Sequence, residues 1–197
     1  NLKIHYNKLF LSFGNSYLTA QQSSRKTQER RMKFLLNGLK IKKNEKILDF
    51  GCGTGHLYEY LKKKKLDVNY MGIDIADKII KYNKKVYKKN SKVKFMNLDI
   101  LNTKKEIGKY DHIFISGTFN NKIKDNWNWM QKCLEFLYKR TKKSLVFNNL
   151  NFYVDYYDKN LFYIKPEKVF SFCKKNLSLF VSISNDYEIK KGIIPFE

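Results

Sequence analysis

Residues 46–57 read Lys-Ile-Leu-Asp-Phe-Gly-Cys-Gly-Thr-Gly-His-Leu, a short apolar run that breaks into alternating glycines. The apolar run is typical of a buried strand, and Gly51, Gly53 and Gly55 allow a tight turn in which the backbone comes close to a ligand. A helix is expected to begin after Gly55, and its free N–H groups favour a carboxylate or a phosphate. The stretch therefore predicts a strand, a ligand-binding turn and a helix.

The glycine spacing, G-x-G-x-G, departs from the dinucleotide-binding pattern G-x-G-x-x-G, whose third glycine would fall at His56. This argues against a dehydrogenase. The segment from Leu48 to Leu57 instead resembles motif I of the class I methyltransferases, whose pattern is L-D-x-G-C-G-x-G. The resemblance implies S-adenosylmethionine as the cofactor and S-adenosylhomocysteine as the product. A glycine-rich turn that binds no ligand is the alternative.

Strand and helix patterns alternate along the rest of the chain. Further strands are expected at residues 70–74, 93–98, 112–116, 144–148 and 179–184, and helices at residues 24–39, 57–61, 77–89, 127–137 and 167–175. This order predicts an α/β, Rossmann-like, doubly wound and mostly parallel sheet with helices on both faces. We expect a single domain over residues 1–197, with an N-terminal helical lid or cap at 1–40 and the core at 45–197.

The family resemblance also concerns the C-terminus. Class I methyltransferases usually end with an antiparallel seventh strand between the fifth and sixth strands, whereas this chain stops at Glu197. Without that strand two apolar strand edges would be left unpaired. We therefore expect the seventh strand to be missing at the C-terminus.

The resemblance places the cofactor residue by residue. Asp49 would accept from the ammonium of the methionine part, and the glycine loop would hold its carboxylate. Asp74 would accept from both ribose hydroxyls, and Ile75 would pack against the adenine face. Asp99 would accept from the adenine amino group, although an Asp after a strand is also a common turn residue. Cofactor contacts are expected at Arg31, Asp49, Gly51, Cys52, Gly53, Gly55, Asp74, Ile75, Asp99, Ile100, Ser116 and Gly117.

The end of the fourth strand, Ser116–Asn120, should border the methyl acceptor. It contains neither the [DNS]-P-P-[YFW] sequence of amino-methylating DNA enzymes nor a Pro-Cys pair for pyrimidine C5 chemistry. If the acceptor is a hydroxyl, a general base is needed. The candidates are Tyr153, Asp155 and Asp158, while His56 and His112 are less favoured by position; for each, a polar structural residue is the alternative.

The N-terminal segment carries aromatic residues ahead of the first strand, at Tyr6, Phe10, Phe13 and Tyr17. Residues 28–32 resemble a Q-x-x-R-[FM] element found before motif I in bacterial methyltransferases that act on small molecules. This resemblance favours a lid over the site. The alternative is that these aromatic residues only pack the first helix on the sheet.

Composition limits the partners. The formal net charge is +22, which favours nucleic acid, but only four of the 40 basic residues are arginines and the lysines are spread along the chain. We interpret the charge mainly as solvated surface. The three cysteines and three histidines have no metal-ligand spacing, and no apolar run is long enough for a membrane helix. We expect no metal, no membrane and a reducing cytoplasmic setting.

These observations together predict a methyltransferase that moves a methyl group from S-adenosylmethionine to an oxygen or nitrogen of a small molecule. Two alternatives stay open. One is an RNA or protein methyltransferase that uses the basic surface, and the other is a non-catalytic module that binds S-adenosylmethionine.

Overall fold

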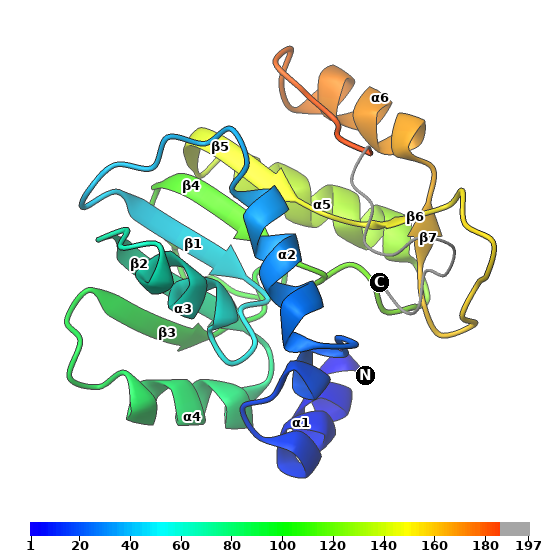
Figure 1. Cartoon of the computed structure of the whole chain (residues 1–197). Helices are drawn as coiled ribbons and strands as arrows, with labels where there is room; N and C mark the ends of the chain where they lie inside the picture. Colours follow the sequence, from blue (N-terminus) through cyan, green and yellow to red (C-terminus); the bar gives the residue numbers. More distant parts are fainter. Residues whose placement is uncertain (186–197) are drawn as a thin grey trace.

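A five-stranded parallel sheet forms the centre of the computed structural model, which describes residues 1–185 (Figure 1). The strands lie in the order β3-β2-β1-β4-β5. Their bounds are Lys46–Phe50 for β1, Asn69–Asp74 for β2, Val93–Asn97 for β3, Tyr110–Ile115 for β4 and Thr141–Phe147 for β5. The order reverses at β1, so the crevice between β1 and β4 at their carboxyl ends is where such sheets bind ligands.

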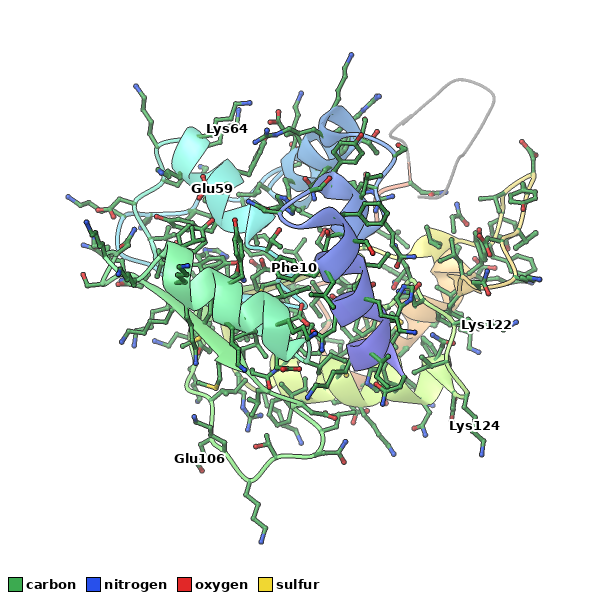
Figure 2. All side chains as sticks on the ribbon, turned by 90° about the horizontal axis from the view of Figure 1, so that it is seen from below. Phe10, Glu59, Lys64, Glu106, Lys122 and Lys124 are labelled. Atoms are coloured by element: carbon green, nitrogen blue, oxygen red, sulfur yellow. The ribbon has the colours of Figure 1, made fainter. Side chains whose placement is uncertain are left out.

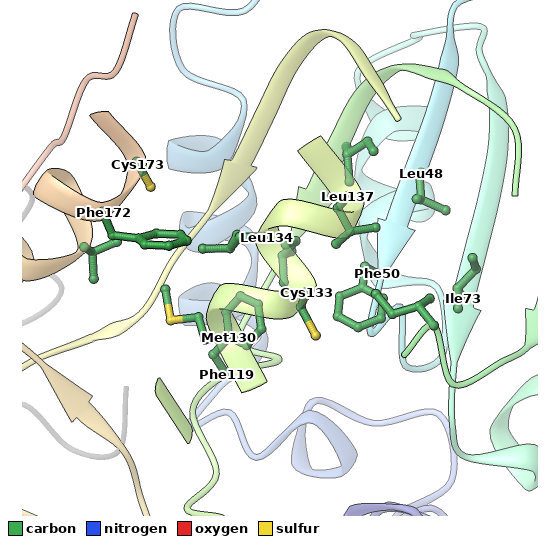
Figure 3. Packing of buried hydrophobic residues seen from close by; sticks show 14 of the residues in the cluster. Leu48, Phe50, Ile73, Phe119, Met130, Cys133, Leu134, Leu137, Phe172 and Cys173 are labelled. Carbon is green, nitrogen blue, oxygen red and sulfur yellow. The ribbon is translucent and has the colours of Figure 1, made fainter. Parts of the chain in front are cut away.

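Helices cover both faces of the sheet, as the sequence predicts (Figure 1). Their bounds are Leu2–Phe13 for α1, Arg25–Leu35 for α2, His56–Lys63 for α3, Asp77–Val86 for α4, Asn126–Tyr138 for α5 and Pro166–Asn176 for α6, with a short 3₁₀ helix at Tyr17–Ala20. On one face, α5 packs against the sheet through residues such as Leu134, and α6 adds Phe172, which contacts Trp127 of α5, to the same cluster (Figure 3). On the other face, α2, α3 and α4 bury Met32, Leu61 and Ile80.

The strands alternate between these two cores with the period of two that an extended chain requires. In β1, Ile47 packs in the core beneath α2 and α3, whereas Leu48 and Phe50 belong to the core beneath α5 (Figure 3). A strand buried on both faces has few polar positions. The carboxylate of Asp49, which lies between Leu48 and Phe50 and is only 2% exposed, is therefore an exception that needs a reason.

The prediction of a sixth strand at residues 179–184 is wrong. After α6 the Ser178 hydroxyl accepts from the backbone N–H of Phe180, and the chain turns back along the helix instead of entering the sheet. The side chains of Leu179 and Phe180 are 75% and 95% exposed. An apolar pattern makes a strand only where a neighbouring backbone pairs with it, and no strand of residues 1–185 pairs with this segment. Within residues 1–185 β5 is an edge of the sheet, so the expectation about a seventh strand stays a prediction.

The structure also contains a strand pair that the sequence analysis did not predict. Leu150–Asn151 (β6) and Tyr163–Ile164 (β7) form a parallel pair beside the main sheet. The helix expected at residues 24–39 is shorter than predicted: Ser24 caps its first turn by accepting from the N–H of Thr27, and α2 ends at Leu35. Gly38, with φ +74°, lies in the turn that follows.

Candidate functional site

The glycine turn after β1 has the backbone that its spacing predicts. Gly51, Gly53 and Gly55 have φ values of +76°, +50° and +84°, which L side chains rarely adopt. A Cβ on Gly51 would lie 2.1 Å from the hydroxyl oxygen of Thr118, so packing leaves no room for a side chain at this position. A Cβ on Gly53 would meet nothing within 4 Å. The backbone of Gly53 therefore faces open space, as a ligand-binding turn requires.

Asp49 presents a buried carboxylate just before this turn. One oxygen, Oδ2, accepts a 2.6 Å hydrogen bond from the hydroxyl of Tyr70. The other oxygen, Oδ1, is buried and has no hydrogen-bond partner among the described residues. Burial raises the pKa of this carboxyl to about 7, against a smaller lowering by the Tyr70 bond. A buried carboxylate with a vacant acceptor position is suited to a cationic partner.

Asp74 ends β2 and reaches the same turn. Its Oδ2 accepts from the N–H of Gly53 at 3.0 Å, and its Oδ1 accepts from the N–H of Ala76 at 2.9 Å. Burial raises its pKa, while these backbone bonds oppose the rise. A carboxylate can accept about four hydrogen bonds, so two hydroxyl donors can still be added.

A cavity of about 900 Å³ joins these groups at the carboxyl ends of the strands. Most of the predicted cofactor residues line it together: Arg31, Asp49, Gly51, Cys52, Gly53, Asp74, Ile75, Ser116 and Gly117. Gly55 does not line it but begins α3, where its Cα faces the ring of Phe95. Burial raises the pKa of the Cys52 thiol, which keeps this side chain neutral.

The structure does not bring Asp99 and Ile100 to the cavity. The carboxylate of Asp99 accepts from the N–H of Leu101 at 3.1 Å and from Asn102 Nδ2 at 2.9 Å, so it closes a turn after β3. Ile100 is 3% exposed and packs in the core beneath α5. The alternative of a turn residue therefore describes Asp99 in this structure, because a short Asp side chain bonds readily to the backbone two residues later.

The candidate general bases also differ in whether they line the cavity. Tyr153 and Asp155 lie outside the cavity, and the hydroxyl of Tyr153 donates to Glu167 at 2.5 Å. Asp158 does line the cavity, but its Oδ1 accepts from the N–H of Asn160 at 2.7 Å in a turn. His112 lies at the opposite end of the sheet, between Ser144 and Glu45.

His56 lines the cavity, where Gln28 Nε2 donates to its Nδ1 at 2.9 Å. Burial lowers its pKa, so the ring is neutral near pH 7. Gln28 is the first residue of the Q-x-x-R-[FM] element, and Arg31, its fourth, is 5% exposed. The element thus ties α2 to the start of α3 beside the glycine turn.

The N-terminal segment walls the cavity through Tyr6, residues 19–22 and α2. Tyr6 Oη accepts a 2.6 Å hydrogen bond from Asn121 Nδ2, which also donates to Gln21 Oε1 at 3.0 Å. Phe10 packs instead against Tyr82 of α4, with ring centroids 5.3 Å apart (Figure 2). The aromatic residues of this segment therefore divide: one borders the cavity and another packs α1 on the core. Asn121 was missed because a loop amide gives no sequence signal, whereas Asn120 ends the segment that was expected to border the methyl acceptor.

Comparison with known proteins finds similarity to methyltransferases. The family model of the methyltransferase domain matches residues 47–140, which run from β1 through α5. A putative methyltransferase of Mycobacterium tuberculosis, Rv1506c, is 26% identical over 147 residues, which cover 72% of this chain and 86% of the relative. These matches support an S-adenosylmethionine-dependent methyltransferase.

Two further similarities cover a smaller share of the other protein. A tRNA (guanine-N(7)-)-methyltransferase of Clostridium botulinum is 39% identical over 61 residues, which are 29% of this chain and 28% of that protein. The structure of the plantazolicin methyltransferase BpumL in complex with S-adenosylhomocysteine has a TM-score of 0.50 and 24% identity, over 76% of this chain and 60% of that chain. At that identity the likeness is one of fold.

The site of this methyltransferase fits S-adenosylmethionine. Asp49, whose Oδ1 is buried without a partner among the described residues, and Gly53, whose face is open, both line the cavity, as an ammonium and a carboxylate on one ligand require. Within residues 1–185 no helix combines the length and the apolar character needed to cross a bilayer.

Proposed function

We propose that this methyltransferase transfers a methyl group to an oxygen or nitrogen atom of a small molecule and releases S-adenosylhomocysteine. The observation that carries the proposal is one continuous cavity of about 900 Å³. The N-terminal segment forms part of its wall, and the cavity continues past the cofactor residues to the loop after β4. A cavity of this size has room for a cofactor and a small acceptor.

The residues have distinct tasks in this proposal. Asp49 accepts from the ammonium of the cofactor, the N–H groups of the glycine turn receive its carboxylate, and Asp74 accepts from its ribose hydroxyls. Ile75 supplies apolar surface for the adenine. The bound cofactor supplies a methyl group on a positively charged sulfur. The walls of the cavity exclude water and align the acceptor, which provides much of the acceleration in a displacement reaction.

The acceptor gives up a proton when it is a hydroxyl or a protonated amine. Of the three candidate bases in the loop between β6 and β7, only Asp158 lines the cavity, and its carboxylate already closes a turn. This arrangement favours an amine, which needs no buried base because its proton can pass to water.

Cys52, Cys133 and Cys173 are buried and free, which agrees with the cytoplasmic setting that we propose.

RNA methylation is the second candidate, because the net charge is +22 and one partial relative methylates tRNA. The cavity favours the small molecule. Arg31, Lys122, Lys124 and Lys159 are the four basic residues among the 36 described residues that line it, against 40 in the chain of 197. Three of the four share one wall, and Arg31 is the basic residue on the rest of the described lining, so the cations do not continue along the cavity as a bound polynucleotide would require.

Two measurements test the proposal. Calorimetry with S-adenosylmethionine and S-adenosylhomocysteine should show one saturable site on the purified protein. A screen of small amines and hydroxyl compounds should then show acceptor-dependent release of S-adenosylhomocysteine. Binding without turnover on any acceptor would favour the non-catalytic module, and turnover on RNA alone would favour the second candidate.

A further inference from the structure

One wall of the cavity is built from two loops. One follows β4 and contributes residues 120–124, and the other connects β6 to β7 and contributes residues 158–161. Backbone bonds join them: Phe162 N donates to Asn120 O at 2.7 Å, and Lys122 N donates to Asn160 O at 2.8 Å. Because β4 lies on the opposite side of β1 from β2, the strand that ends in Asp74, we place the acceptor beside this wall.

Three lysines line this wall: Lys122, Lys124 and Lys159. All three are exposed, and none forms an ion pair with another described residue. Figure 2 shows Lys122 and Lys124 projecting from the same side of the molecule. Asp158 is the acidic residue in these two loop stretches, and its carboxylate is engaged by the Asn160 N–H. The wall thus carries an excess of positive charge at the mouth of the cavity.

A neutral hydrogen-bond donor stands near this wall. Both amide hydrogens of Asn121 are used, one by Tyr6 Oη and one by Gln21 Oε1. Tyr6 Oη is therefore an acceptor in its bond with Asn121, and no described residue accepts its own hydrogen. Burial, with a smaller contribution from the charge of Asp74, raises the pKa of Tyr6 and keeps the hydroxyl protonated. Its proton is available to a ligand in the cavity.

Apolar side chains complete the same end of the cavity. Trp129 of α5 and Leu161 both line it. The wall therefore offers cations at its rim, a hydroxyl donor and apolar surface behind them. Among residues 120–124 and 158–161 of the lining, a cationic ligand group finds one carboxylate, Asp158, which closes its own turn, whereas an anionic group finds three ammonium groups.

We propose that the methyl acceptor carries a carboxylate or a phosphate, which Lys122, Lys124 and Lys159 bind, and that the Tyr6 hydroxyl donates a hydrogen bond to the same molecule. This inference rests on the proposed small-molecule methyl transfer. It selects among acceptors by charge: of two compounds with the same methylated atom, the one with the anionic group is the substrate.

The first experiment separates this inference from the proposed function. Calorimetry with S-adenosylhomocysteine compares the wild type, the triple variant Lys122→Ala/Lys124→Ala/Lys159→Ala and a control triple variant. The control, Lys62→Ala/Lys84→Ala/Lys88→Ala, removes the same charge from exposed lysines of the described surface that do not line the cavity. Equal affinity in all three proteins is expected. A wild type that does not bind S-adenosylhomocysteine overturns the proposed function itself.

The second experiment titrates the three S-adenosylhomocysteine complexes with sodium phosphate and, separately, with sodium acetate, at constant ionic strength. We expect saturable anion binding in the wild type and the control, weakened about tenfold in the cavity variant, since each exposed ion pair contributes modestly. The anion that binds with the higher affinity shows whether the anionic group of the acceptor is a phosphate or a carboxylate. Equal binding in all three proteins, or no binding by the wild type, overturns the inference.

Two further measurements complete the test. Release of S-adenosylhomocysteine with 4-hydroxybenzoate and glycine should exceed that with phenol and ethylamine, and the excess should be lost in the cavity variant but kept in the control. Faster turnover of the neutral partners overturns the inference. A single-stranded oligonucleotide that binds with steep salt dependence, and that phosphate does not displace, assigns the lysines to nucleic acid and also overturns it.

Discussion

The affinity for S-adenosylhomocysteine should depend on pH through Asp49. This carboxyl is buried, its pKa is raised to about 7, and its free oxygen is the acceptor we assign to the ligand's ammonium. Binding then requires the ionised form. The ionised fraction is about 91% at pH 8 and about 9% at pH 6, so the dissociation constant should be about tenfold larger at pH 6, or about 1.4 kcal/mol.

Proton release provides a second, independent readout. If the ligand's ammonium binds the ionised carboxylate, each molecule bound at pH 6 displaces about 0.9 proton from Asp49, and at pH 8 only about 0.1. Calorimetry in two buffers of different ionisation enthalpy measures this number directly. Loss of the proton from the ligand's ammonium would weaken binding at the higher pH, which is the opposite direction, so it does not produce the effect.

The matched control is Asp49→Asn, which keeps the shape and the acceptor for the Tyr70 hydroxyl but cannot ionise. Its affinity should be lower at pH 8 and should lack the part of the pH dependence that belongs to Asp49. Asp74 also has a raised pKa, so the comparison between wild type and variant is what isolates Asp49. The reasoning is refuted if the wild type binds equally at pH 6 and pH 8, or if the variant has the same slope.

Three more predictions concern single positions. Asp74→Ala should weaken S-adenosylhomocysteine binding at least tenfold in calorimetry, since a charged acceptor of two hydroxyls contributes about 1.5–3 kcal/mol per bond; an unchanged affinity would exclude the ribose role. Gly51→Ala should lower the melting temperature more than Gly53→Ala, because only the first Cβ meets Thr118, while Gly53→Ala should mainly reduce ligand affinity; the reverse order would show that the turn is not shaped for a ligand. Glu45 is buried, which opposes ionisation, but bonds from Lys143, the Lys42 N–H and His112 lower its pKa to about 2. Its contribution should be present above pH 4.5 and lost as pH falls from 4.5 to 2, so Glu45→Gln should flatten acid denaturation there; an identical acid transition would contradict this.

The cofactor half of the site could be predicted from sequence because it depends on local patterns. The glycines need positive φ values wherever they stand, and Asp49 and Asp74 follow strands whose carboxyl ends must meet in a parallel sheet. These side chains do lie in one cavity. Asp99 shows the limit of this reasoning: it follows a strand in the same way, yet its carboxylate bonds to its own turn.

The sequence by itself determined the alternation of strands and helices, the two-sided burial of the sheet and the glycine turn, since each is set by residues close together in the chain. Only the tertiary structure decided that residues 179–184 leave the sheet, that Asn121 binds Tyr6 and Gln21, and that Lys122, Lys124 and Lys159 share one wall. Those outcomes depend on contacts between residues 38 to 115 positions apart or on the presence of a neighbouring strand. Local propensity carries no record of such partners, because the free energy of a long-range contact depends on where the rest of the chain has folded.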